Sequence, residues 1–352
     1  MNNLVLEALN RDLSAIPQPL HDALTTLLSD PIACTPDRQR LLLETVHFLS
    51  AKLSETNITM MADVMQEIRL GLNTFTPYHA YRKVSFFGSA RSHEDDPQYR
   101  QTKACAEALK NQGYMIITGG GGGMMQAANE GAGRDHSFGI NINLPMEQSP
   151  NPVVAGSPRH FYCQYFFTRK LFFMKESDAI ILTPGGFGTL DEGFEALTLI
   201  QTGRNPPVPI VLLEAPGDHY WGPFIHSWVR RLIDNGFITH DDQDILFHTD
   251  HIETAVQYIC DFYTNYHSFC YCDDWIILRF QEPLSRSTLE RINVEFDDII
   301  TSGHIEQIFQ WPDEEDERYS HFPRLRFKMD PHRMNVLPHL IRRANALHRN
   351  EP

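Results

Sequence analysis

The 352-residue sequence lacks the features that mark a membrane or secreted protein. No stretch reaches the ~18 apolar residues that a membrane-spanning helix needs. The first residues, MNNLVLEALNRDLSA, have neither a basic start nor an unbroken apolar core, which argues against a secretory signal peptide. Cysteines are few and scattered, and Cys270 and Cys272 lie too close together for a usual zinc knuckle. We therefore expect a cytoplasmic protein with reduced thiols, no bound metal and no membrane contact.

Positive charge is also scarce. The chain has 30 Lys and Arg residues against 45 Asp and Glu residues, which gives a formal net charge of −15 at pH 7. Binding along a nucleic-acid backbone depends on a basic surface, so we expect no nucleic-acid partner. Any phosphate group must then be bound locally. With 42% hydrophobic residues, the chain is long enough for one sizeable core and one or two smaller modules.

Two common nucleotide-binding motifs are missing, although the sequence has conspicuous glycine turns. Gly119 to Gly123 are five consecutive glycines, and a second turn, PGGFGT, begins at Pro184. Neither turn has the G-x-G-x-x-G spacing, and no acidic residue ends the strand after the pentaglycine helix, so NAD is disfavoured. No G-x-x-x-x-G-K-[ST] run occurs, which excludes a triphosphate-cleaving P-loop. A purely structural role for the pentaglycine, as a flexible turn with close helix–sheet packing, stays open.

Short apolar runs alternate with helical patterns over residues 81–265. We expect parallel strands at Lys83–Phe87, Tyr114–Thr118, Phe138–Leu144, Ala179–Thr183 and Pro209–Leu213. Helices are expected over Pro97–Asn111 and Met124–Gly133. This alternation predicts an α/β fold, a doubly wound parallel sheet of the Rossmann-like kind, in which ligands bind at the carboxyl ends of the strands.

Accessory regions flank this predicted nucleotide-binding catalytic domain. Residues 1–80 have apolar residues at helical spacing and are expected to form a helical cap or a dimerising layer. Residues 266–352 have a strand–helix–strand–strand–helix pattern, which predicts a small α+β module. The elements of this βαββα pattern are Trp275–Phe280, Pro283–Ile300, Ile305–Phe309, Arg324–Met329 and Val336–Leu347. The module either binds a small-molecule regulator or scaffolds a dimer or a lid.

The second glycine turn opens a helix in which backbone N–H groups can approach an anion, where the helix dipole also favours negative charge. Asp191 and Glu192 follow in the first turn, where acidic residues ordinarily serve as helix caps and dipole partners. Beside a turn that binds an anion, such an acid can also face a ribose whose phosphate is held nearby. Arg169-Lys170 lies within a run of phenylalanine, leucine and methionine. Such pairs are usually exposed, but apolar surroundings predict a partly desolvated pair that needs an anionic partner. Arg91 suits capping and phosphate binding equally.

Five runs of the sequence carry a further signal. They are FFGSAR, TGGGGGMMQAANEGA, NLPMEQSPNP, FFTRKLFFMKESDA and PGGFGTLDEGFEALTLIQTG. Over residues 83–263 the chain thereby resembles the LOG (lonely guy) type nucleoside 5'-monophosphate phosphoribohydrolases, whose sequences are often mislabelled lysine decarboxylases. The resemblance implies that water cleaves the N-glycosidic bond of a purine or pyrimidine nucleoside monophosphate, giving free base and ribose 5-phosphate. It also implies a homodimer or a higher homo-oligomer.

The resemblance implies Glu192 and Arg169 as the catalytic pair. Together with the glycine turns, it places the substrate at Gly88, Ser89, Arg91, Gly120, Gly121, Gly122, Gly123, Met124, Glu147, Lys170, Gly185, Gly186, Gly188, Thr189 and Thr198. The sequence departs from the family pattern at Gly122 and Gln126, where relatives commonly have a small non-glycine residue and a glutamate.

The expected chemistry assigns a separate role to each member of the pair. Bond cleavage builds positive charge on the sugar, which Glu192 stabilises while it orients or deprotonates water. Arg169 positions the substrate and keeps Glu192 ionised. No Schiff-base lysine is recognisable, so we expect no pyridoxal phosphate or other cofactor. A nucleotide-binding sensor that uses the same pocket without turnover is the alternative.

Overall fold

The computed structural model describes residues 35–144, 149–309 and 319–350, together with Gln18, Asp22 and Thr26. The chain forms two compact units, residues 1–68 and 69–352. The first unit contains helix α3 (Pro36–Ser50) and most of α4 (Glu55–Phe75). The helices predicted within residues 1–80 are thus present from residue 36 on, and the earlier part of that region lies almost wholly outside the described residues. The predicted domain boundaries remain predictions.

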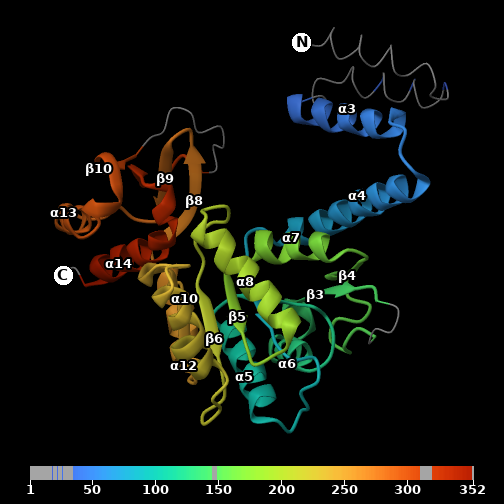
Figure 1. Cartoon of the computed structure of the whole chain (residues 1–352), viewed down its shortest axis with the longest axis horizontal. Coiled ribbons are helices and arrows are strands. Elements are labelled where there is room, and N and C mark those ends of the chain that lie inside the picture. The colour runs from blue at the N-terminus through green and yellow to red at the C-terminus, as the bar shows by residue number, and fades with distance from the viewer. Residues whose placement is uncertain are drawn as a thin grey trace. The chain divides into compact units, whose positions relative to one another are not determined.

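The second unit is built on a seven-stranded, fully parallel sheet, which confirms the predicted α/β fold (Figure 1). Its strands are β1 (Lys83–Phe87), β2 (Met115–Thr118), β3 (Ser137–Ile142), β4 (His160–Cys163), β5 (Ala179–Leu182), β6 (Ile210–Leu213) and β7 (Leu246–Thr249). The order across the sheet is β4-β3-β2-β1-β5-β6-β7. The chain starts in the middle, runs out to β4 and returns to β5, so the topological switch point lies between β1 and β5.

The edge strands β4 and β7 were not predicted, whereas the five inner strands were. Every residue of the inner strands is buried, because helices cover both faces, and such strands appear in the sequence as predominantly apolar runs. Both edge strands contain exposed residues, among them Tyr162 and His248. Their short, mixed sequences therefore lack the pattern on which the prediction depended.

Helices cover the two faces of this sheet in separate layers. They include α5 (Pro97–Asn111), α6 (Met124–Ala132), α7 (Phe166–Glu176), α8 (Phe187–Gln201), α9 (Trp221–Pro223), the π-helix η4 (Phe224–Val229), α10 (Arg230–Asp234), α11 (His240–Gln243) and α12 (Ile252–Phe262). Short 3-10 helices lie at η2 (Thr76–Tyr78) and η3 (Arg134–His136). Side chains of α7 and α8 share one apolar core with the sheet, and those of α5, α6 and α12 share another. No helix in the described part of the chain is long and apolar enough to cross a membrane.

The C-terminal residues form an antiparallel sheet of order β10-β11-β9-β8 with helices on one side. Its elements are β8 (Tyr266–Cys272), β9 (Trp275–Phe280), α13 (Arg286–Glu295), η5 (Asp297–Ile299), β10 (Ile300–Ile308), β11 (Arg324–Met329), η7 (Pro331–Val336) and α14 (Leu337–Arg349). The predicted βαββα order is therefore incomplete, because β8 precedes it. Strand β8 is a half-buried edge strand of mixed polarity, so its sequence gives no clear signal. Helix α13 is also shorter than predicted, because it ends at Glu295 and β10 already begins at Ile300.

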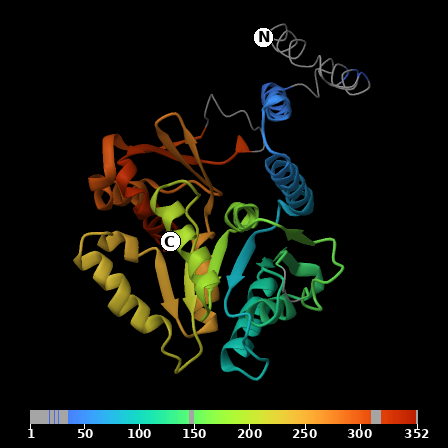
Figure 2. The same ribbon diagram turned by 45° about the vertical axis from the view of Figure 1, so that its right-hand side comes forward.

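The C-terminal sheet contacts the end of α8 (Figures 1 and 2). The hydroxyl of Tyr271 in β8 donates a hydrogen bond of 2.9 Å to the carbonyl of Gly203, just after that helix. Asn335 of η7 donates to Asp242 at 2.8 Å. Helix α8 therefore begins at the carboxyl end of β5 and ends against the C-terminal module.

Candidate functional site

Three glycine-containing turns meet at the carboxyl ends of β1, β2 and β5. The N–H of Ser89, after β1, donates to the carbonyl of Pro184, after β5, at 3.0 Å. The carbonyl of Ser89 accepts from the N–H of Met124, which follows the pentaglycine turn, at 2.9 Å. The turns pack so closely that a Cβ on Gly88 would lie 2.0 Å from the Thr183 hydroxyl oxygen and 2.7 Å from Cβ of Met124. The glycines thus allow three strand ends to share one small space.

A cavity of about 730 Å³ opens between these turns, at the switch point between β1 and β5. Nine of the predicted site residues line it: Gly88, Ser89, Arg91, Arg169, Gly185, Gly186, Gly188, Thr189 and Glu192. Sequence reasoning missed other lining residues, notably Met125, Phe187 and Tyr220. The side chain of Phe187 is 93% exposed, although it belongs to the second glycine turn. A large aromatic residue inside a glycine motif is the signal that the sequence offered for it.

Five further predicted site residues belong to the pentaglycine turn or follow it directly. Gly120, Gly121, Gly122, Gly123 and Met124 are not among the residues that line the cavity. The carbonyls of Gly120 and Gly121 accept from the backbone N–H and side-chain amide of Asn151, at 2.8 and 3.0 Å. Asn151 therefore fixes the pentaglycine turn through two of its carbonyl groups. The Met125 side chain also packs against this turn, because a Cβ on Gly119 or Gly121 would lie within 3 Å of it.

Lys170 and Thr198 do not line the cavity either. The Lys170 ammonium lies 2.8 Å from carboxylate oxygens of both Asp191 and Glu195. Thr198 lines a separate, mostly apolar cavity of about 140 Å³ between α8 and η4. Glu147 lies outside the described residues. The structure thus brings Lys170 to α8, where it contacts acids that flank Glu192, and separates Thr198 from the cavity.

Glu192 and Arg169 are neighbours, as expected for a working pair. Helix α7 presents Arg169 and α8 presents Glu192, with 3.6 Å between Nη2 and Oε1. Their side chains are 14% and 3% exposed, respectively. Oε2 of Glu192 has no hydrogen-bond partner among the described residues. A buried carboxylate oxygen without a partner is costly, so this atom is available to a ligand in the cavity.

Burial raises the pKa of Glu192 to about 7. Arg169 and Lys170 act in the opposite direction, while the negative charges of Asp191 and Glu195 add to the rise. The expectation that Arg169 keeps Glu192 ionised is therefore met only in part, because desolvation outweighs the attraction of the guanidinium. The carboxyl group changes charge near neutral pH, which suits a group that accepts and releases a proton.

Arg91 lies at the rim of the cavity as an exposed cation. Its backbone N–H donates to the Ser89 hydroxyl at 3.1 Å, and its guanidinium has no ion pair within the described residues. Among those residues, no group of three or more His, Cys, Asp or Glu side chains is placed to hold a metal ion.

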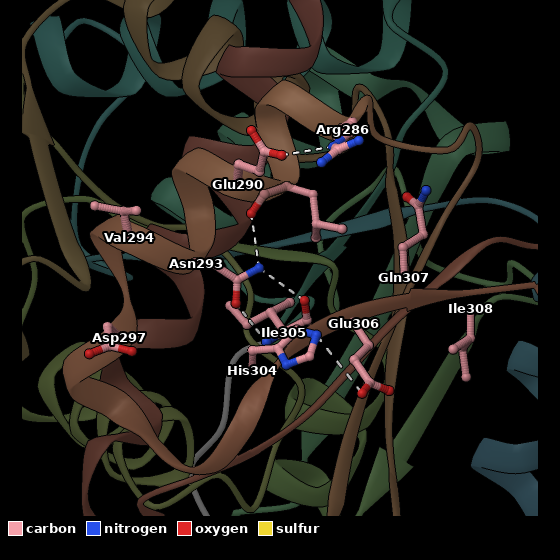
Figure 3. Close-up of a pocket in the computed structure, with 11 residues that line it drawn as sticks. Arg286, Glu290, Asn293, Val294, Asp297, His304, Ile305, Glu306, Gln307 and Ile308 are labelled. Atoms are coloured by element: carbon pink, nitrogen blue, oxygen red, sulfur yellow. Dashed lines mark hydrogen bonds and ion pairs between the residues drawn. The ribbon is translucent and has the colours of Figure 1, made fainter.

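A second hollow, of about 750 Å³, lies between α13 and β10 (Figure 3). Its polar groups bond to one another. Arg286 pairs with Glu290 at 2.8 Å, and the Asn293 side chain bonds the backbone N–H and carbonyl of Ile305 at 2.8 and 3.0 Å. None of the predicted site residues lines this groove. Although its volume is similar, it has no counterpart of Glu192, a buried acid with one oxygen that lacks a partner among the described residues, and we assign it no ligand.

Part of this chain is similar in sequence to known proteins. A family model described as "Possible lysine decarboxylase" matches residues 121–259. Cytokinin riboside 5'-monophosphate phosphoribohydrolase LOG of Oryza sativa subsp. japonica is 30% identical over 173 residues, which cover 47% of this chain and 67% of the relative. Its counterpart LOG3 of Arabidopsis thaliana is 29% identical over 171 residues, covering 47% of this chain and 76% of the relative.

A distant likeness to a solved structure is also present. The molybdenum cofactor binding protein of Rippkaea orientalis is 19% identical, and the match covers 51% of this chain and 94% of that chain, with a TM-score of 0.35. The segment that the family model matches, residues 121–259, contains the PGGFGT turn, Arg169 and Glu192. As its motifs predicted, the chain belongs to the LOG-type phosphoribohydrolase family.

Proposed function

We propose that the protein is a hydrolase that cleaves the N-glycosidic bond of a nucleoside 5'-monophosphate, releasing the free base and ribose 5-phosphate. The observation that carries this proposal is the buried Glu192 carboxylate, which has one oxygen without a partner among the described residues and lies beside a glycine turn. The relatives named above are phosphoribohydrolases of cytokinin riboside 5'-monophosphate, which supports hydrolysis of this kind.

The second glycine turn suits the 5'-phosphate. In the described part of the chain, the N–H groups of Gly186, Phe187 and Gly188 have no protein acceptor. These groups open the 15-residue helix α8, so its dipole adds a favourable potential for an anion. Arg91 adds a full positive charge at the rim. Phosphate binding there orients the sugar, which converts remote binding energy into alignment of the reacting carbon.

Glu192 then acts on the reacting end of the nucleotide. As the bond between C1' and the base nitrogen breaks, its electron pair leaves with the base and positive charge builds on the sugar. The Glu192 carboxylate stabilises this charge and takes a proton from the water that adds to C1'. The proton passes on to the departing base, so the carboxylate is regenerated. Arg169 holds Glu192 in place and offers the substrate a positive charge.

The test is a panel of purine and pyrimidine ribonucleoside 5'-monophosphates, with free base and ribose 5-phosphate measured by chromatography. We expect equal amounts of the two products from at least one monophosphate. The matching nucleosides, which lack the phosphate, are the control and should release base at least about a hundredfold more slowly, because phosphate binding supplies the orientation. Tight nucleotide binding without base release would instead indicate a sensor.

The rate of base release should depend on pH through Glu192. Below a pKa of about 7 the carboxyl group is protonated and cannot accept a proton from water. We therefore expect kcat/KM to rise about tenfold per pH unit below pH 7 and to level off above it. Initial rates at low substrate concentration from pH 5 to 9 measure this. In Glu192→Gln, the pH profile of the residual kcat/KM should lose the inflection near pH 7. Only an inflection from the substrate phosphate, whose second pKa is about 6, should remain. A rate that falls as pH rises through 7 would show that the protonated acid is the active form.

A further inference from the structure

Tyr220 belongs to none of the sequence motifs, yet it lines the cavity. We propose that Tyr220 is a positioning residue for phosphate binding, because its hydroxyl fixes the orientation of the Gly185–Gly186 peptide. This inference rests on the proposed function, since it assigns the turn at Gly185 to the 5'-phosphate.

The contact itself is short and specific. The Tyr220 hydroxyl donates a hydrogen bond of 2.5 Å to the carbonyl oxygen of Gly185. In a trans peptide the carbonyl and the following N–H point in opposite directions. Holding the Gly185 carbonyl therefore also fixes the direction of the Gly186 N–H, one of the groups without a protein acceptor in the described part of the chain. A Gly-Gly peptide without this bond has little to stop it from rotating, because neither residue has a side chain.

A buried acid holds the tyrosine before any ligand binds. Glu214 follows β6 and is 4% exposed. Its Oε2 accepts hydrogen bonds from the backbone N–H groups of Tyr220 and Trp221, at 2.7 and 2.8 Å. Its Oε1 lies 2.7 Å from Nε2 of His248. The fully buried Trp221 packs edge-on against the Tyr220 ring, with 4.7 Å between the ring centroids. The phenol is thus preorganised, which reduces the cost of ordering the turn when a ligand binds.

The chain offers a matched control at the other end of the same helix. The hydroxyl of Tyr271 also donates to a glycine carbonyl, that of Gly203, at 2.9 Å. Tyr220→Phe and Tyr271→Phe each remove one hydroxyl and one hydrogen bond to the backbone beside α8. A general loosening of α8 would follow from both variants, whereas misorientation of the phosphate-binding turn would follow from Tyr220→Phe alone.

The experiment uses the full chain. It measures ribose 5-phosphate binding by titration calorimetry, together with kcat and KM for the release of base from a nucleoside monophosphate. We expect Tyr220→Phe to weaken ribose 5-phosphate binding and raise KM by about tenfold, with kcat reduced less than about threefold. Tyr271→Phe should stay within about twofold of the wild type in both measurements, because its hydroxyl lies at the opposite end of the helix.

Three results would overturn the proposal: unchanged binding in Tyr220→Phe, equal weakening in both variants, or a loss of kcat with unchanged binding. The last would mean that Tyr220 acts on the reacting atoms. A wild-type protein that binds ribose 5-phosphate but releases no base would refute the proposed hydrolysis, while calorimetry would still decide the role of Tyr220. If the wild type does not bind ribose 5-phosphate, the assignment of this turn is wrong.

Discussion

Glu192→Gln is expected to lower kcat for base release by about a thousandfold while changing KM less than about threefold, since a general base contributes roughly 10²–10⁴ to the rate. Glutamine keeps the size of the side chain and still offers hydrogen bonds. It has no negative charge to stabilise the developing cation, and its amide does not accept a proton from water. Because the phosphate-binding turn is untouched, the substrate should still bind. The loss therefore belongs to the transition state.

Glu195→Gln is the matched control for this variant. Glu195 lies one turn further along α8 and pairs with Lys170, and it does not line the cavity. Lys170 keeps its second carboxylate, Asp191, at 2.8 Å. We expect Glu195→Gln to retain kcat within about threefold, because it removes a charge near Glu192 without touching the reacting atoms. Steady-state rates with one nucleoside monophosphate measure both variants. Wild-type turnover in Glu192→Gln, or an equal loss in both variants, would contradict the assignment of Glu192.

The fold follows from the sequence wherever burial is complete. Strand β5, with four apolar residues, lies at the centre of the sheet and was predicted from its apolar run. Its neighbour β1 is buried throughout and was also predicted, although Lys83 and Ser85 interrupt its apolar residues. Strand β8 was missed for the opposite reason. It is an edge strand whose residues are mostly half-buried, and its mixture of Tyr, His, Ser and Cys does not alternate between apolar and polar residues. The position of β8 at the edge follows from its antiparallel pairing with β9, which begins at Trp275, and not from a hydrophobic pattern of its own.

The site residues could likewise be predicted where they lie in local motifs, but not where they depend on tertiary contacts. The glycine turn, Arg169 and Glu192 lie in local motifs, and their meeting point follows once a doubly wound sheet is expected. The pKa of Glu192 does not follow, because it depends on how deeply α7 and α8 bury the carboxyl group. Tyr220 was missed because its only link to the glycine turn is a tertiary hydrogen bond. Thr198 was included through the resemblance alone, and the structure places it at another cavity.

Gly123→Ala is expected to lower the free energy of unfolding by about 3–5 kcal/mol, the largest loss that we anticipate for removing a single glycine from these turns. Gly123 has φ 62° and ψ −133°, a conformation that residues with a Cβ rarely adopt. That backbone strain alone costs about 1–3 kcal/mol. A Cβ would also lie 2.2 Å from the Ser89 carbonyl oxygen and 2.6 Å from the Ala90 carbonyl carbon. Both are backbone atoms, so no side-chain rotation relieves the clash.

The surrounding hydrogen bonds make this clash difficult to relax. The Ser89 carbonyl that a new methyl group would displace accepts the N–H of Met124, at 2.9 Å, and the Ser89 N–H donates to Pro184 at 3.0 Å. Moving Ser89 therefore disturbs the contacts among all three glycine turns. Urea unfolding followed by circular dichroism measures the loss. Gly186→Ala is the control, because a Cβ there meets no atom within 4 Å and the backbone is extended. We expect that variant to lose less than about 1 kcal/mol. If the two variants are equally stable, the pentaglycine turn is not held against Ser89, and the three strand ends do not form one rigid corner.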